Sequence, residues 1–232
     1  MDDDELDTLL FRESMMLTVD AHGDSYAHED EPPRLPLRAP DLSARETELL
    51  QEVNELRRDP AAYAELLIRR RKHFYLAADL QPGDPPQTNP NLSEGKSAVL
   101  EAIEHLQKAP AVKPIKWRDG LHLASQDIRK LIDGQETTQP TSPDQVNYAI
   151  YSYGEYQGRA TQLVGFGYNN PKEVLCHLLI SDGDESRHSR NILLDPDFSY
   201  GGLALGEEER GMVVFHFITE KYWLFDADSS EE

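Results

Sequence analysis

Residues 200–219, YGGLALGEEERGMVVFHFIT, place two apolar stretches on either side of an acidic turn, and they decide the class of fold. Large apolar residues occupy both sets of alternate positions in the second stretch: Val213, Phe215 and Phe217 on one side, and Met212, Val214 and Ile218 on the other. Successive side chains of a strand point to opposite faces of a sheet, so this strand is apolar on both faces. It predicts a central strand that is covered by helices above and below.

Helical patterns surround these strands. Ser43 and Glu46 form a capping box, in which the hydroxyl caps a backbone N–H and the glutamate reaches back. Asp59-Pro60 predicts the start of a second helix, because Asp caps helices and Pro suits their first position. Apolar spacing predicts three more helices: about 93–107, from Asp119 to about 132, and from Asn170-Pro171 to about 179. The fold class predicted is therefore α/β, a three-layer α–β–α sandwich with a central, mostly antiparallel sheet.

The middle of the chain carries shorter patterns. Residues 110–117 predict an extended link that places Trp117 in the core. Residues 134–145 are polar and predict a loop, after which Val146, Tyr148 and Ile150 alternate as in a strand. The glycines between 154 and 167 predict turns.

We expect three segments: an acidic N-terminal tail over 1–42, a domain over 43–223, and an acidic C-terminal tail over 224–232. The N-terminal tail carries one apolar patch, whose spacing suits a short amphipathic helix: Leu6, Leu9, Leu10, Phe11, Met15, Met16 and Leu17. Such a patch either docks a partner or folds back on its own domain. We predict that it docks a protein partner.

The net charge of −20, from 23 Lys and Arg against 43 Asp and Glu, limits the partners. Nucleic acids and anionic lipid surfaces both attract basic segments, so neither is expected. The basic run Arg69–Lys72 points in several directions on a helix and predicts a solvated face. The single cysteine, Cys176, cannot form an internal disulfide and is expected to be a small buried residue. With an acidic start and no long apolar run, the sequence predicts a cytoplasmic protein.

Four segments resemble the CAP superfamily, the SCP-like group of cysteine-rich secretory, antigen 5 and pathogenesis-related proteins, and its bacterial and protist branch above all. They are Val53–Tyr63, Pro114–Leu121, the stretch from Asp182-Gly183 through His188 and Asn191-Ile192-Leu193 to Phe198, and Tyr200–Leu203. The segments occur in the family's order and span about 43–222. The resemblance implies an α–β–α sandwich with a metal-binding cavity.

The resemblance also implies where the four metal ligands of that cavity would fall. The two histidine positions match Ile128 and His188, and the two acidic positions match Gln162 and Asp182. Ile128 cannot bind a metal, and Gln162 lacks the charge. We therefore expect no metal and no cofactor, and an alternative remains in which His177, Asp182, Asp184, Glu185 and His188 form a substitute cluster. In the favoured interpretation Asp182 and His188 hold a loop by hydrogen bonds.

Other side chains could carry chemistry, and each has a simpler interpretation. Ser186 and Ser189 flank His188, but adjacent residues rarely reach the geometry of a nucleophile and its base. His216 is expected in the core with one partner, and His105 and His122 are expected on the surface. An aromatic set is expected to pack on the sheet rather than to form a ligand cage: Tyr148, Tyr151, Tyr153 and Tyr156.

Three functions follow from these observations. We predict a non-enzymatic scaffold or interaction component of a larger assembly, with a cytoskeletal assembly as one candidate. A binding module for a small apolar ligand, such as a sterol or lipid, is the second hypothesis, because the resemblance implies that activity for some members. A degenerate metal-dependent hydrolase is the third.

Overall fold

The computed structural model describes residues 34–85, 92–133, 142–166, 170–206 and 211–224, together with the backbone of residues 16–19. Its centre is a five-stranded sheet in the order β1-β4-β6-β5-β2. The strands are β1 (Met16–Val19), β4 (Ala160–Gly165), β6 (Val213–Ile218), β5 (Tyr200–Leu205) and β2 (Lys116–Trp117). Only β2 and β5 pair in parallel, so the sheet is mostly antiparallel, as the sequence predicted.

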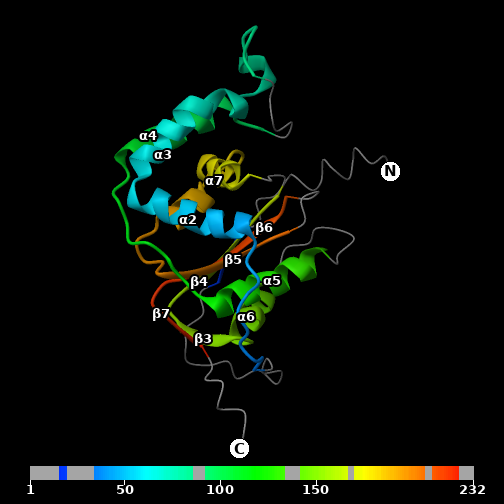
Figure 1. The fold of residues 1–232 in the computed structure, drawn as a ribbon. Coiled ribbons are helices and arrows are strands. Elements are labelled where there is room, and N and C mark those ends of the chain that lie inside the picture. Colours follow the sequence, from blue (N-terminus) through cyan, green and yellow to red (C-terminus); the bar gives the residue numbers. More distant parts are fainter. Residues whose placement is uncertain are drawn as a thin grey trace, which may run out of the picture.

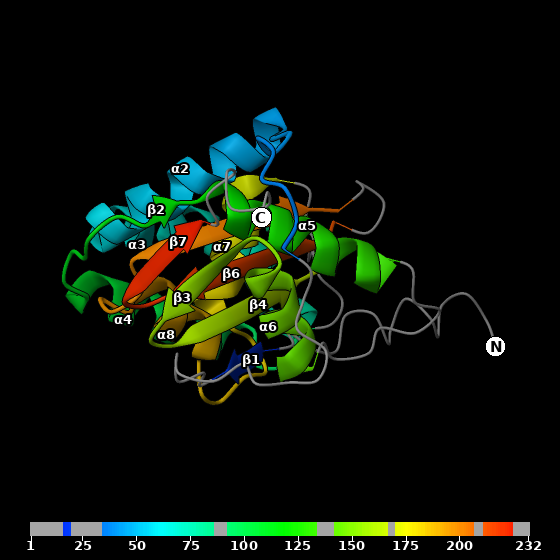
Figure 2. The ribbon, with the colours of Figure 1, turned by 90° about the horizontal axis from the view of Figure 1, so that it is seen from below.

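Helices cover both faces of this sheet, so the predicted three-layer sandwich is confirmed (Figure 1). One layer contains α2 (Ala44–Arg58), α3 (Pro60–Arg70), α4 (Lys96–Lys108), α7 (Pro171–Ile180) and α8 (His188–Leu194). The other contains α5 (Asp119–Asp133) and α6 (Pro143–Tyr151). Viewed from below, α5 and α6 lie in front of the sheet with a small second sheet of β3 (Gly154–Gln157) and β7 (Lys221–Leu224) (Figure 2).

The central strand β6 divides the core as its alternation predicted. Phe215 and Phe217 belong to the apolar cluster beneath α2, α7 and α8, whereas Val214 and Ile218 belong to the cluster beneath α5 and α6. All six residues of β6 are buried. Because both faces are covered, the layer to which a residue belongs follows from its position along the strand.

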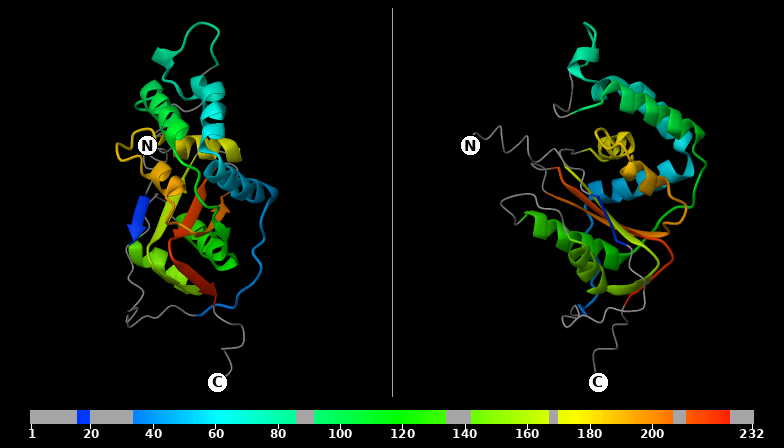
Figure 3. Two further views of the ribbon diagram at one scale, coloured as in Figure 1. Left: turned by 90° about the vertical axis from the view of Figure 1, so that its left-hand side faces the viewer. Right: turned by 180° about the vertical axis from the view of Figure 1, so that it is seen from behind.

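Helix starts follow the predicted caps. Ser43 and Glu46 form both bonds of the capping box, and Asp59 accepts from the backbone of Ala62 at the start of α3. Two short 3-10 helices, η1 (Arg71–Phe74) and η2 (Ala77–Asp79), then lead away from α3. The packed pair α3 and α4 lies on the side of the molecule far from α5 and α6 (Figure 3).

The middle of the chain differs from the prediction. Residues 143–151 form the helix α6, so the strand expected at Val146, Tyr148 and Ile150 is wrong. Ser142 and Gln145 cap this helix with a second capping box, and Val146 and Ile150 pack together on the core because they lie four residues apart. The glycine-containing stretch predicted as turns contains β3 and β4.

Strand β1 comes from the segment that was predicted to be an acidic tail. Its residues pair antiparallel with β4, from Met16 opposite Leu163 to Val19 opposite Ala160. The sheet therefore extends upstream of the boundary predicted at Ser43. The other residues predicted to dock a partner, Leu6, Leu9, Leu10, Phe11 and Met15, lie outside the described residues.

Candidate functional site

The structure does not bring the four positions of the implied metal cavity together. Ile128 on α5 and Gln162 on β4 lie in the layer of α5 and α6, where Gln162 shares a sheet face with Ala160 and Val164. Asp182 follows α7 and His188 begins α8, both in the other helical layer. The five-stranded sheet separates the two pairs.

Gln162 instead belongs to a buried polar centre under α5. It lies directly opposite His216 across β4 and β6. The Nδ1 of His216 is 2.8 Å from the Oγ of Ser125, which also donates to the carbonyl of Leu121 at 2.9 Å. Ser125, His216 and Gln162 are all at most 1% exposed. Sequence analysis correctly expected His216 in the core, but nothing local pointed to Ser125 as its partner.

The protonation of this centre follows from its burial. Burial lowers the pKa of His216 to about 3, so the imidazole is neutral at physiological pH. If the Ser125 hydroxyl donates to Leu121, then Nδ1 of His216 carries the proton and donates to Ser125. Among the described residues, Nε2 of His216 and Oε1 of Gln162 have no hydrogen-bond partner.

A Ser–His hydrogen bond of this length also occurs between a catalytic nucleophile and its general base, but this pair lacks two further features that catalysis needs. No described carboxylate hydrogen-bonds to the imidazole to orient it, and neither side chain reaches the surface. A substrate would have to pass α5 to reach Ser125. The hydrogen bond between Ser125 and His216 therefore joins α5 to the central strand β6 and has a structural role.

His122 strengthens the same contact between α5 and the sheet, and it is not the surface residue that was expected. It is 2% exposed, and its Nδ1 accepts from the backbone N–H of Leu203 on β5 at 3.1 Å. The neighbouring Gly202 allows this approach, since a Cβ there would lie 2.2 Å from the backbone carbon of Leu121. Burial lowers the pKa of His122 below its usual value.

Asp182 holds the turn that leads into α4, as the hydrogen-bonding interpretation of this loop anticipated. Its carboxylate accepts from the backbone N–H groups of Ser93, Glu94 and Gly95 at 2.6, 2.8 and 2.9 Å, at the start of α4. Negative charge at this end of a helix is favourable. Arg187 adds paired contacts of 2.6 Å to both oxygens of Glu94. The loop after α7 is therefore fastened to α4.

His188 and His177 do not complete a metal cluster with Asp182. The backbone N–H of His188 donates to Asp184 at 2.8 Å, which caps α8. The ring of His177 lies edge-on to Phe74, with ring centroids 4.7 Å apart, and burial lowers its pKa to about 3. Within the described ranges, no three His, Cys, Asp or Glu side chains lie close enough to hold a metal ion.

Arg57 joins two of the segments that carry the family resemblance and also bonds the residue just before another. Its fully buried guanidinium donates to the carbonyls of Lys113, Leu193, Asp195 and Phe198, at 2.7 to 3.1 Å. Burial lowers its pKa to about 10, which still leaves it charged at neutral pH. One turn earlier on α2, the amide of Asn54 bonds both backbone groups of Ile115. These motif residues therefore link α2, the strand β2 and the loop before β5.

Trp117 and Cys176 complete the interior next to this junction. Trp117 is half-buried, less enclosed than predicted, and packs on Phe217 with ring centroids 6.4 Å apart. Cys176 is 1% exposed, as expected for a small core residue, and burial raises the pKa of its thiol to about 12. A neutral, enclosed thiol is a poor nucleophile.

The predictions for the surface histidine, the basic run and the tyrosines agree only in part with the structure. His105 is exposed on α4, as predicted. The basic run is largely paired: Arg70 contacts Glu173 and Lys72 contacts Asp84. The four tyrosines do not form one group, since Tyr148 on α6 is 44% exposed while Tyr156 on β3 is buried and donates to Asn147 at 2.8 Å.

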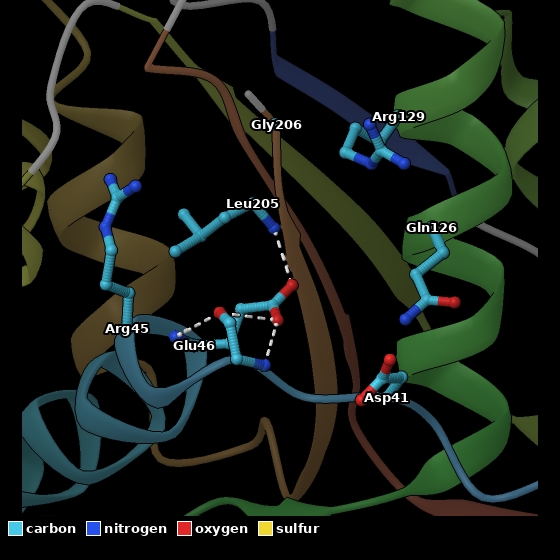
Figure 4. Close-up of a pocket in the computed structure, with 8 residues that line it drawn as sticks. Asp41, Arg45, Glu46, Gln126, Arg129, Leu205 and Gly206 are labelled. Atoms are coloured by element: carbon cyan, nitrogen blue, oxygen red, sulfur yellow. Dashed lines mark hydrogen bonds between the residues drawn. The ribbon is translucent and has the colours of Figure 1, made fainter. Parts of the chain in front are cut away.

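A surface cleft of about 440 Å³ lies between the start of α2 and the side of α5, at the end of β5 (Figure 4). It is lined by Asp41, Ser43, Arg45, Glu46, Gln126, Arg129, Leu205 and Gly206. Glu46 is occupied by its cap contacts and by the N–H of Leu205 at 2.9 Å, and Arg129 pairs with Asp133 at 2.7 Å. The lining is charged, and its Ser43 hydroxyl, which donates to Glu46 at 2.9 Å, belongs to the capping box of α2.

Comparisons with known proteins assign no family to this chain. A scan against models of protein families finds no match, and no curated protein matches. Among solved structures, the chain is similar to a cysteine-rich secretory protein from Staphylococcus aureus subsp. aureus Mu50, with 17% identity and a TM-score of 0.37. The match covers 59% of this chain and 41% of that chain, so it spans less than half of that protein. No helix in the described ranges is long and apolar enough to cross a membrane.

Proposed function

We propose that this protein is a CAP-like domain that functions by binding another protein, as a scaffold or interaction component of a larger assembly, and not by catalysis. The observation that carries the proposal is the use of the polar residues at the implied site. Gln162 is buried opposite His216, and Asp182 bonds the turn that precedes α4. In a catalytic site these side chains would face a substrate, whereas here they make contacts within the fold.

The CAP-like assignment is supported by the way in which the resembling segments meet. Arg57 and Asn54 on α2 bond the link before β2, and Arg57 also bonds the loop that follows α8. The backbone of Arg118 then donates to Gly201 at 2.9 Å, which joins the second segment to the fourth. Segments far apart in the sequence thus form one junction, which is the arrangement that the proposed CAP-like domain needs.

A small apolar ligand is less well supported than a protein partner. Pockets for such ligands are lined mainly by apolar and aromatic side chains. The cleft between α2 and α5 is lined instead by Asp41, Arg45, Glu46 and Arg129. A hydrolase would need a nucleophile or metal-bound water that a substrate can reach, and neither Ser125 nor Cys176 is accessible.

The N-terminal patch is the proposed contact surface for the partner. It combines Leu6, Leu9, Leu10 and Phe11 with a strongly acidic setting, a composition that commonly orders only on binding. We propose a cytoplasmic partner, and cytoskeletal assemblies are the first candidates for a test. Charge alone would favour a basic partner surface, while the apolar side chains would supply most of the contact area.

The test is a quantitative comparison of proteins that co-purify with the tagged full chain from its native cells. One variant carries serine at Leu6, Leu9, Leu10 and Phe11. The matched control carries Asn or Gln at Asp2, Asp3, Asp4 and Glu5, which removes charge and keeps the apolar patch. We expect the first variant to lose specific partners and the control to keep them. Unchanged partners in the first variant would remove the basis for this contact surface.

A further inference from the structure

The sheet edge beside β4 is covered by strand β1. Strand β1 is the outermost strand on that side, and it pairs with β4 through four residue pairs. On its other side β4 pairs with β6 through six. Residues 20–43 separate β1 from α2, and the described part of that link, 34–43, contains neither helix nor strand. The edge is thus covered by a short strand on a long connection.

Removal of β1 would expose the edge of β4 to pairing with another strand. Unpaired N–H and C=O groups on an edge strand are a template for another extended chain. The residues of β4 that β1 faces, from Ala160 to Leu163, are at most 1% exposed. Their side chains alternate between the two core clusters, with Leu163 in one and Ala160 in the other. The edge therefore offers backbone groups between two helical layers.

This setting restricts what can pair there. Helix α6 contacts β1, and the layer of α2 and α7 lies on the opposite face of the sheet. A strand between two apolar layers is disfavoured if it carries charges on either side. The present occupant, MLTV at Met16–Val19, has no charged residue. A competing segment should be extended, uncharged over about four residues and antiparallel to β4.

We propose that the β4 edge is a docking site for an extended, uncharged segment of a different protein, and that β1 occupies this site in the free chain. This inference rests on the proposed function of protein binding, and it names a surface for it. The attached β1 competes as a tethered ligand, so only a segment that pairs more favourably displaces it. The predicted docking patch ends at Leu17, so it overlaps the first two residues of β1.

The test uses a labelled peptide of residues 14–21, SMMLTVDA, as a stand-in for the partner segment. The receptor is the full chain with Leu17→Pro and Thr18→Pro. Backbone N–H groups point alternately to the two sides of a strand, so two consecutive prolines remove one donor that faces β4. Fluorescence polarisation then measures binding to this variant and to the unmodified chain. A peptide with the same two prolines is the matched control.

We expect saturable binding to the proline variant, at least tenfold weaker binding to the unmodified chain, and none of the control peptide. Equal binding to both chains, or no saturable binding to the variant, overturns the proposal. If the proline variant does not fold, a chain with Gly-Ser-Gly-Ser at residues 16–19 replaces it. If that chain also unfolds, β1 is a fixed part of the core and the proposal fails.

Two further measurements locate the site and identify the occupant. Thr18 lies opposite Thr161, so a peptide with Cys in place of Thr18 should form a disulfide with the Thr161→Cys receptor and not with a Val164→Cys receptor. If light scattering shows a dimer that the proline variant abolishes, the occupant is a second copy and the proposal of a different partner is overturned. The peptide assay leaves Leu6, Leu9, Leu10 and Phe11 unaltered, and the co-purification variants leave β1 unaltered, so the two proposals fail separately.

Discussion

Replacement of Arg57 by Met should destabilise the protein more than any other single change on α2. Arg57 donates five hydrogen bonds to four backbone carbonyls, one at Lys113 and three within residues 193–198. Met fills a similar space and removes every donor. The carbonyls would remain buried, and an unsatisfied buried polar group costs about 1–3 kcal/mol.

The net loss is smaller than the sum over four carbonyls. Water and small shifts will satisfy some of them, and removal of a buried charge recovers part of its desolvation cost. That cost is visible in the pKa of Arg57, which burial lowers to about 10. We expect the free energy of unfolding to fall by about 3–5 kcal/mol, the range for a broken buried network. The thermal midpoint should fall by about 6–20 °C for a chain of this size.

Urea denaturation followed by circular dichroism measures this loss, with Arg58→Met as the matched control. Arg58 is the next residue on α2, but its side chain is 61% exposed and pairs only with Glu55. The control should change the free energy of unfolding by less than about 1 kcal/mol. Arg57→Lys should fall between the two, because an ammonium keeps the charge but has only three donors. If Arg57→Met and Arg58→Met are equally stable, the junction does not hold the fold.

Four further predictions concern pH dependence, thiol reactivity, the Asp182 contacts and metal binding. The folded state holds His216 neutral, with its pKa lowered to about 3, so the free energy of unfolding should fall as the pH drops below the unfolded pKa near 6.5. The loss attributable to this residue is about 2 kcal/mol between pH 7 and pH 5. In His216→Asn the urea midpoint should therefore vary less with pH. Cys176 should react with a thiol reagent at pH 8 only after unfolding, and rapid stoichiometric labelling of the native chain would contradict its burial. Asp182→Asn should cost about 1–2 kcal/mol by weakening its hydrogen bonds to the turn before α4, and an unchanged urea midpoint would show that these bonds contribute nothing. Calorimetry should find no zinc site tighter than roughly 10 µM, and nanomolar one-to-one binding that His188→Ala abolishes would restore a metal site.

Local patterns in the sequence were sufficient for most helix starts and for the class of fold. The cap formed by Ser43 and Glu46 depends on residues three apart, and the alternation around Phe215 depends on neighbours along one strand. Such signals can be recognised from sequence because the atoms that interact are already close along the chain. They predicted the central strand, its two covered faces and the start of α3 at Asp59-Pro60.

Residues 143–151 show where local patterns were ambiguous. Val146 and Ile150 fit both the alternation of a strand and the four-residue spacing of a helix. The Ser142–Gln145 capping box is a local signal for the helix, whereas the strand was predicted from the alternation alone. Packing of α6 on α5 decides between the two structures, because only the helix places both residues on the same core face.

The candidate site depended on contacts that no local pattern contains. Ser125 meets His216 across 91 positions of sequence, and His122 meets Leu203 across 81. The sequence by itself determined that Ile128 and Gln162 are poor metal ligands and that Asp182 and His188 are close along the chain. Only the tertiary structure decided that the two pairs lie on opposite sides of the sheet. The physical reason is that each strand sends alternate side chains to two separate layers, and the chain crosses from one layer to the other between Gln162 and Asp182.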